Sequence, residues 1–267
     1  MKKVLAMIVA GLVGTAAHAS WIVIYEDDFA GDAGPATDTE PLVEPDGFEH
    51  QIGAGNVYID GSGRLHTGDG GVTSRYDVNL GEVITDNWTA IRWEATIGTP
   101  SENHWFGLGF SETGTRSFTT SVGGVNPGVG PWIQFRADGE GTMRGGAGTN
   151  NASSQVDFNY EGGDVVDIVF TFNIAEQTGT LSVNGTAIVF DNDSTVFPIV
   201  YTNNDGTSLP VIQWASIQWT SQDSIEEGGA YISHSTISVI PEPGTLGLLG
   251  MALIGLMAVR RRYRSAA

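Results

Sequence analysis

Apolar and polar side chains alternate over long stretches of this chain, and this period of two constrains its fold more than any other feature. Between Ser20 and Ile240, no segment shows the spacing of apolar residues that is typical of an amphipathic helix. Alternation places apolar residues on one face of a strand and polar residues on the other. It is clearest in four segments: residues 91–97, 166–174, 211–219 and 237–239.

Shorter apolar runs between glycine-rich turns predict further strands. The dipeptide Asn184-Gly185, which separates two such runs, favours the two-residue turn of a β-hairpin. We expect Trp93 and Trp219 to lie in the core, because they occupy apolar positions of the alternating segments. Ten or more strands without an internal repeat predict an all-β fold, an antiparallel β-sandwich. The further runs are residues 21–25, 56–59, 105–110, 132–136, 180–183 and 186–190.

Three segments resemble the concanavalin A-like jelly roll of laminin-G-type and legume-lectin-type domains. Residues 165–189, VVDIVFTFNIAEQTGTLSVNGTAIV, give a strand, a turn at Gln177-Thr178-Gly179, a second strand and a return after Asn-Gly. Residues 55–68 and 230–239 fall where that family pairs its first and last strands. The resemblance implies a two-sheet sandwich. A different β-sandwich or a jelly-roll carbohydrate-binding module would give much the same pattern.

Composition narrows the chemistry of the region between Ser20 and Ile240. It contains no cysteine, which excludes disulfides, thiol catalysis and thiolate metal sites. Thirty acidic residues stand against six arginines and no lysine, a net charge of −24. Nucleic acid and anionic lipid are poor partners for such a surface, because phosphate binding depends on cationic contacts. The acidity suits either solubility in a salty or calcium-rich setting or a dedicated role in binding cations.

The N-terminus has the three parts of a secretory signal peptide. Two lysines precede an apolar run over residues 4–13, and Ala17-His18-Ala19 fits a small-x-small cleavage site. Cleavage after Ala19 would leave Ser20 as the first mature residue. A retained N-terminal anchor is the alternative, but the apolar run is short for a membrane span. We expect residues 1–19 to be removed during export.

The C-terminus also has three parts, beginning with the triplet Pro241-Glu242-Pro243. An apolar run over residues 244–259 predicts a helix of about 24 Å, close to the hydrocarbon thickness of about 30 Å. The run is followed by Arg260, Arg261 and Arg262, which favour a cytoplasmic C-terminus. Because proline cannot continue a strand ladder or a helix, we expect the triplet to be extended and accessible to an enzyme.

This order of parts resembles the PEP-CTERM sorting signal of Gram-negative bacteria that make exopolysaccharide. The resemblance implies processing near the Pro-Glu-Pro triplet by an exosortase, a membrane protease-transpeptidase, with transient anchoring in the inner membrane. An ordinary C-terminal membrane anchor is the alternative. The predicted organisation is a signal peptide (1–19), an exported domain (20–240) and a sorting signal (241–267) that contains a transmembrane helix (244–259).

No catalytic residue emerges from the sequence. The concanavalin-like fold includes glycoside hydrolases, and retaining enzymes need two carboxyl groups about 5–5.5 Å apart. The Glu-x-Asp-x-x-Glu string typical of the glucanase members does not occur here. Asp164 and Asp167 are three residues apart and would face opposite sides of a strand. A secreted glycan-active hydrolase is therefore the alternative hypothesis rather than the main one.

Two oxygen-rich loops favour a hard cation such as Ca²⁺. They are Asp191-Asn192-Asp193-Ser194 and Asn203-Asn204-Asp205-Gly206, with Asp191, Asp193 and Asp205 as the candidate metal ligands. Neither loop has the EF-hand spacing. Side chains of this kind also form turns by bonding to their own backbone, so a pair of simple turns is the alternative.

Two tryptophans are the candidate ligand-binding residues. Exposed aromatic rings stack on the faces of sugars while polar neighbours bind the hydroxyl groups. Trp105 and Trp132 lie near glycine or proline and are the least core-like tryptophans of the domain. Together with the sorting signal, they predict a non-enzymatic protein of the cell surface or extracellular matrix that binds polysaccharide or a surface partner. A purely structural matrix component is a further hypothesis.

Overall fold

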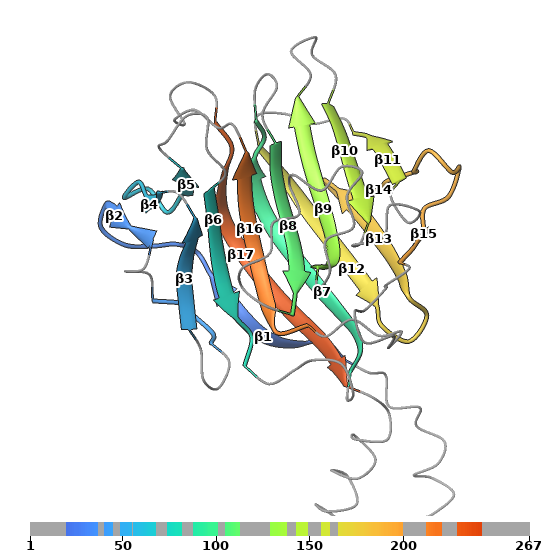
Figure 1. Cartoon of the computed structure of the whole chain (residues 1–267), viewed down its shortest axis with the longest axis horizontal. Coiled ribbons are helices and arrows are strands. Elements are labelled where there is room, and N and C mark those ends of the chain that lie inside the picture. Colours follow the sequence, from blue (N-terminus) through green and yellow to red (C-terminus); the bar gives the residue numbers. More distant parts are fainter. Residues whose placement is uncertain are drawn as a thin grey trace, which may run out of the picture.

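The protein forms two antiparallel sheets that stack on each other, as the computed structural model in Figure 1 shows. In the part of the chain that the structure describes, one sheet has ten strands and the other has seven. This confirms the predicted all-β, antiparallel architecture. The structure describes residues 20–36, 40–44, 49–54, 56–67, 74–81, 88–100, 105–112, 129–137, 143–148, 156–160, 165–199, 212–220 and 229–241.

The ten-stranded sheet contains the first and last strands of the domain. Its main path runs in the order β14 (Thr186–Ala187), β13 (Thr178–Val183), β12 (Val165–Asn173), β7 (Trp88–Gly98), β17 (Tyr231–Pro241), β5 (Leu65–Thr67), β4 (Val57–Ile59), β2 (Gly34–Pro35). Two strands lie off this path: β1 (Ile22–Asp27) pairs with β17, and β15 (Phe197–Pro198) pairs with β13.

The seven-stranded sheet forms the second layer. Its order is β11 (Val156–Asn159), β10 (Met143–Gly148), β9 (Val129–Ala137), β8 (Trp105–Ser111), β16 (Trp214–Thr220), β6 (Ser74–Asn79), β3 (Glu49–Ala54). Strands β3, β6, β10 and β11 were not predicted from the alternation of apolar residues. Their segments are short, glycine-rich or charged, so the period of two is weak there.

The pairings expected from the jelly-roll resemblance are present. Strand β17 begins beside β5, with Tyr231 opposite His66, so the segment over residues 55–68 does pair with the segment over 230–239. Strands β12 and β13 form the predicted hairpin, but its turn lies over residues 174–177 rather than at Gln177-Thr178-Gly179, because Thr178 and Gly179 already pair with β12. Strand β13 then turns back through Asn184-Gly185. Both turn residues have positive φ, 49° and 75°, as this kind of two-residue turn requires. Of the strand predicted over residues 186–190, only Thr186–Ala187 (β14) forms a strand in the structure.

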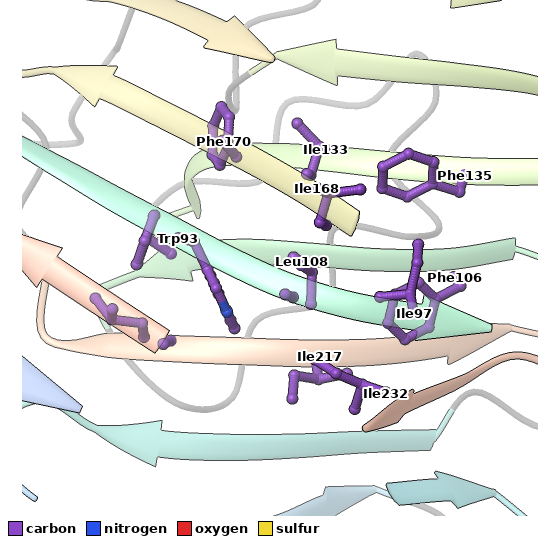
Figure 2. Packing of buried hydrophobic residues seen from close by; sticks show 14 of the residues in the cluster. Trp93, Ile97, Phe106, Leu108, Ile133, Phe135, Ile168, Phe170, Ile217 and Ile232 are labelled. Atoms are coloured by element: carbon purple, nitrogen blue, oxygen red, sulfur yellow. The ribbon is translucent and has the colours of Figure 1, made fainter. Parts of the chain in front are cut away.

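The core lies between the two sheets and is rich in aromatic rings. Trp93 of β7 contacts Phe110 of β8 with 5.3 Å between ring centroids, and Phe110 also stacks on Phe170 of β12. Figure 2 shows that the labelled side chains from both sheets meet in one contiguous layer. Trp93 and Trp219 are 1% and 0% exposed, which confirms their predicted core positions. Burial of this apolar surface is what stabilises a domain without disulfides.

Strand β17 occupies the middle of the ten-stranded sheet. It pairs with β7 along its whole length, while β5 and β1 share its other edge. Because β1 is antiparallel to β17, the start of β1 lies beside the end of β17. Ile22, at the start of β1, is opposite Val239, near the end of β17. The described N-terminal and C-terminal ends of the domain therefore lie at the same end of the sandwich (Figure 1).

Candidate functional site: the polar face of the seven-stranded sheet

The outer side of the seven-stranded sheet, away from the other sheet, carries mainly polar and aromatic side chains. In β8, Phe106, Leu108 and Phe110 belong to the core, so alternation places Trp105 and its i+2 neighbours on the outer side. Cross-strand register aligns the outer residues of neighbouring strands in rows. We define the polar face as Gln51, Arg75, Asp77, Trp105, Trp132, Gln134, Arg136, Trp214, Ser216 and Gln218.

The centre of the polar face is shielded from solvent. Asp77 and Gln218 are 0% exposed, and Ser216 and Gln134 are 1% exposed. Even Arg75 is only 7% exposed. Buried polar and charged groups are costly unless they are hydrogen-bonded or paired. We therefore expect the buried polar side chains of this face to be hydrogen-bonded or ion-paired with one another.

Asp77 is the hub of this arrangement. The Nε of Arg75 donates to one carboxylate oxygen at 2.7 Å, and the hydroxyl of Ser216 donates to the other at 2.6 Å. Burial raises the pKa of Asp77, and this effect outweighs the hydrogen bond from Ser216 and the charge of Arg75, which lower it. Strands β6 and β16 are thus joined on their outer side by a buried ionic network as well as by backbone bonds.

At one end of the polar face, a tryptophan and an arginine form an exposed pair. Trp105 begins β8 and lies opposite Arg136 in β9. The guanidinium carbon of Arg136 lies 5.0 Å from the centre of the Trp105 ring, a cation–π contact. Both residues are partly exposed. The contact holds the indole in place while leaving part of the pair open to a ligand.

The second predicted ligand residue, Trp132, lies on the same face but is not open to solvent. It is 2% exposed and lies outside the contiguous core cluster. It is opposite Gly109 in β8, four positions along β9 from Arg136. The structure thus brings Trp105 and Trp132 onto adjacent strands of one face, and of the two only Trp105 is accessible. Their role in ligand binding stays a prediction.

The opposite end of the polar face has a hollow of about 340 Å³. Glu49, His50 and Gln51 of β3 and Trp214 of β16 line it. Trp214 is half-buried and was not nominated from the sequence. The sequence did carry a signal for Trp214, because in the alternating run over residues 211–219 it lies on the face opposite the predicted core residues.

A buried chain of hydrogen bonds reaches this hollow from the other sheet. Tyr25 of β1 donates to Asp27 at 3.2 Å and is also hydrogen-bonded to Tyr76 of β6. The hydroxyl of Tyr76 in turn lies 3.1 Å from Nδ1 of His50. Burial raises the pKa of Tyr25 well above its ordinary value, and the neighbouring Tyr76 and Asp27 raise it further. The chain ties β1 to β3 through the core and fixes one side of the His50 ring.

The predicted calcium ligands do not form a cluster in the described part of the chain. Asp191 and Asp193 are exposed. Their neighbours make turn bonds: Asn192 accepts from the backbone of Ser194 at 3.1 Å, and the Ser194 hydroxyl accepts from the backbone of Val196 at 3.0 Å. Ca²⁺ takes six to eight oxygens, and two of the four side chains of this loop, those of Asn192 and Ser194, are already engaged in the turn. Asp205 lies outside the described residues.

Among the described ranges, no group of three or more His, Asp and Glu side chains is placed to hold a metal ion. Calcium binding at these loops stays a prediction.

Two of the residues predicted for signal cleavage and sorting lie in the described part of the chain. Ser20 is exposed and lies two residues before the start of β1. Pro241, expected to be accessible, is instead the last residue of β17, pairs with Trp88 and is buried. The expected accessibility was therefore wrong for this residue, whereas its extended conformation is as expected. Proline can end a ladder through its carbonyl although it lacks an N–H. The remaining residues lie outside the described ranges: Ala17, Ala19, Glu242, Pro243, Arg260, Arg261 and Arg262.

Within the described ranges, no helix is long and apolar enough to span a membrane. The helix predicted over residues 244–259 lies outside them.

Solved structures similar to this chain include lectin-type domains. The potassium-bound carbohydrate recognition domain of Emp46p is 12% identical, with 71% of this chain and 87% of that chain covered and a TM-score of 0.46. A legume lectin-like domain from Entamoeba histolytica is 8% identical, with 71% and 88% covered and a TM-score of 0.45. Peanut lectin with a 9mer peptide is 13% identical, with 84% and 99% covered and a TM-score of 0.45.

No curated protein matches the sequence. The model of the PEP-CTERM protein-sorting motif does match it, over residues 239–262. This match confirms the resemblance of the C-terminal segment, and it begins two residues before the Pro-Glu-Pro triplet. The chain therefore carries a PEP-CTERM sorting motif, which implies export.

Proposed function

We propose that this protein is exported, processed by an exosortase-type membrane protease and delivered to the cell surface or extracellular matrix, where it binds polysaccharide through the polar face without catalysis. The sorting motif supports the route. The observation that carries the binding role is the Trp105–Arg136 pair, which is partly exposed at one end of the polar face. The buried Arg75–Asp77–Ser216 network supports the same face from within. Apolar residues would stabilise a face needed only for packing as well or better.

The chemistry at the exposed end of this face suits a sugar. The Trp105 indole offers an apolar surface to the C–H face of a pyranose ring. Arg136, stacked beside it, adds hydrogen-bond donors for hydroxyl or carboxylate groups on the same ligand. A neutral polysaccharide would be favoured over an anionic one, because the acidic domain as a whole repels polyanions.

The direction of the strands would point this end away from the membrane. Trp219, near the end of β16, donates to the carbonyl of Ala230 at 2.9 Å, just before β17 begins. Trp219 lies opposite Phe106, the neighbour of Trp105. The Trp105 end is therefore the end at which β17 starts, and β17 ends at the other, where the sorting signal follows (Figure 1). An anchored domain would present Trp105 outward.

A matched pair of tryptophans tests the binding role. Trp105→Ala should weaken binding to a panel of bacterial polysaccharides at least tenfold, about 1.4 kcal/mol, in a titration of the processed protein. Trp21→Ala is the control, because Trp21 lies under Arg92 at 4.4 Å on the other sheet, so it removes an arginine–tryptophan contact of the same kind. Equal affinity of the two variants would contradict the proposal. Absence of binding combined with self-assembly would favour a structural matrix role.

One observation favours the alternative, a glycan-active hydrolase. Asp77 is a buried carboxyl group with a raised pKa, a property of general acids. Both of its oxygens are engaged, by Arg75 and Ser216, which suits a structural hub better than a proton donor. Turnover of a polysaccharide by the wild type that is lost in Asp77→Asn, with the melting temperature unchanged, would replace the binding proposal.

A further inference from the structure

The sorting motif begins inside the folded domain. The match to the motif starts at Val239, whereas β17 continues to Pro241. Three residues of the matched segment are therefore strand residues of the ten-stranded sheet. They lie in the middle of that sheet, with paired strands on both sides of Val239, rather than in a linker.

Two of these three residues are buried, and Ile240 between them is partly exposed. Val239 is 0% exposed and lies opposite Ile91 on one side and Ile22 on the other. Pro241 lies opposite Trp88 and is buried.

A hydroxyl group fastens the end of the strand. The Oγ1 of Thr89 donates to the carbonyl of Ile240 at 3.1 Å and lies 3.5 Å from that of Pro241. The carbonyl of Thr89 itself accepts from the backbone of Ile174 at 2.9 Å, so the neighbouring turn after β12 steadies Thr89. The end of β17 is thus bound on its β7 side by side-chain as well as backbone contacts.

A processing enzyme cannot easily engage such residues. Enzymes and other proteins that bind extended peptides do so through the peptide's free backbone groups, as an added strand. Val239 lies between two paired strands, so the backbone of this strand end is already engaged within the sheet. Exposing that backbone would require the strand end to leave the sheet, with loss of its buried contacts and hydrogen bonds.

We propose that the folded domain confines processing to peptide bonds on the C-terminal side of Pro241. This inference rests on the proposed exosortase route. In the reaction, the C–N bond of one such peptide link breaks and the acyl carbon bonds to water oxygen or to the nitrogen of an amine acceptor. The departing nitrogen takes the proton that the acceptor gives up. The product keeps β17 whole, so the opposite residues Ile22 and Ile91 keep their partner.

The first test is the intact mass of the processed chain, made from the full-length protein in a host that has the exosortase-type enzyme. The expected C-terminus is Pro241 or a later residue. A C-terminus at Ile240 or earlier would overturn this inference alone. A chain that still ends at Ala267 would overturn the proposed sorting route and this inference with it.

A variant with a flexible insertion before the triplet shows whether the fold, rather than the enzyme alone, selects the peptide bond that is cleaved. Inserting Gly-Ser-Gly-Ser between Ile240 and Pro241 moves the triplet out of the sheet and leaves β17 intact up to Ile240. We expect at least a tenth of the processed chains to end within the insert. Termini unchanged relative to the triplet would mean that the enzyme alone chooses the bond, and would overturn the inference. An unchanged melting temperature confirms that the variant is folded.

Discussion

The two sheets each carry an arginine–carboxylate ion pair, in different surroundings. On β6 of the seven-stranded sheet, Arg75 binds Asp77 two residues along the strand at 2.7 Å. On β7 of the ten-stranded sheet, Arg92 binds Glu94 at the same spacing and 2.6 Å. The side chains of the first pair are 8% and 0% exposed, and those of the second are 26% and 37% exposed. The spacing along the strand and the N–O distances are similar, so the difference in burial decides how much each pair contributes to stability.

The largest expected difference comes from removing each acid. Asp77→Ala should lower the free energy of unfolding by about 3–5 kcal/mol, because it leaves the buried Arg75 without its counter-charge. Glu94→Ala should cost less than about 1 kcal/mol, since water replaces the carboxylate beside Arg92. Urea denaturation of the two variants measures both. Similar losses would show that the two faces are equally solvated in solution.

A second pair of substitutions compares two hydroxyl groups, one on each sheet, that donate a hydrogen bond to an aspartate. Ser216 donates to Asp77 at 2.6 Å, and Thr96 donates to the exposed Asp167 at 2.7 Å. Ser216→Ala should cost about 1.5–3 kcal/mol, the range for a hydrogen bond to a charged group. Thr96→Val should cost about 0.5 kcal/mol or less, as for most surface substitutions. If the order of the two losses were reversed, the Asp77 network would not be the stabilising one.

The same contrast explains what could be predicted from the sequence. The alternation over residues 91–97 predicted β7 correctly, because its inner face is apolar and its outer face is polar and partly exposed. Strand β6, over residues 74–79, was missed. Five of its six residues are buried, yet Arg75 and Asp77 interrupt the apolar run as loop residues would. A sequence shows that a residue is charged, but only the fold shows that a partner two residues away shares its burial.

The candidate site was predictable to a similar degree. Trp105 and Trp132 were chosen by exclusion from the core, and both do lie on the outer face of the seven-stranded sheet. Whether that face is shielded depends on the whole chain, so the burial of Trp132 had no signal in its neighbours. Pro241 shows the reverse case. Its local chemistry predicted a break in structure, whereas the pairing of β17 with β7 extends to it.

The smallest effect is a difference in pH dependence between two aspartates that each bind an arginine. Burial raises the pKa of Asp77 on the shielded face. For Asp60 in the β4–β5 turn, slight burial opposes the change, but hydrogen bonds from Ser62 and Arg64 and the charge of Arg64 lower the pKa. The two carboxyl groups should therefore contribute to stability with opposite dependence on pH.

The raised pKa of Asp77 means that its proton is bound more tightly in the folded state. The resulting stability is fully present below the unfolded pKa of about 3.8 and is lost as the pH rises through the folded pKa. Asp60 contributes stability above its unfolded pKa that is lost as the pH falls through its folded pKa. Denaturation from pH 3 upward should therefore show the stability of wild type relative to Asp77→Asn falling with pH, and relative to Asp60→Asn rising. Parallel trends for the two variants would mean that Asp77 is solvated like Asp60, and that the polar face is open rather than shielded.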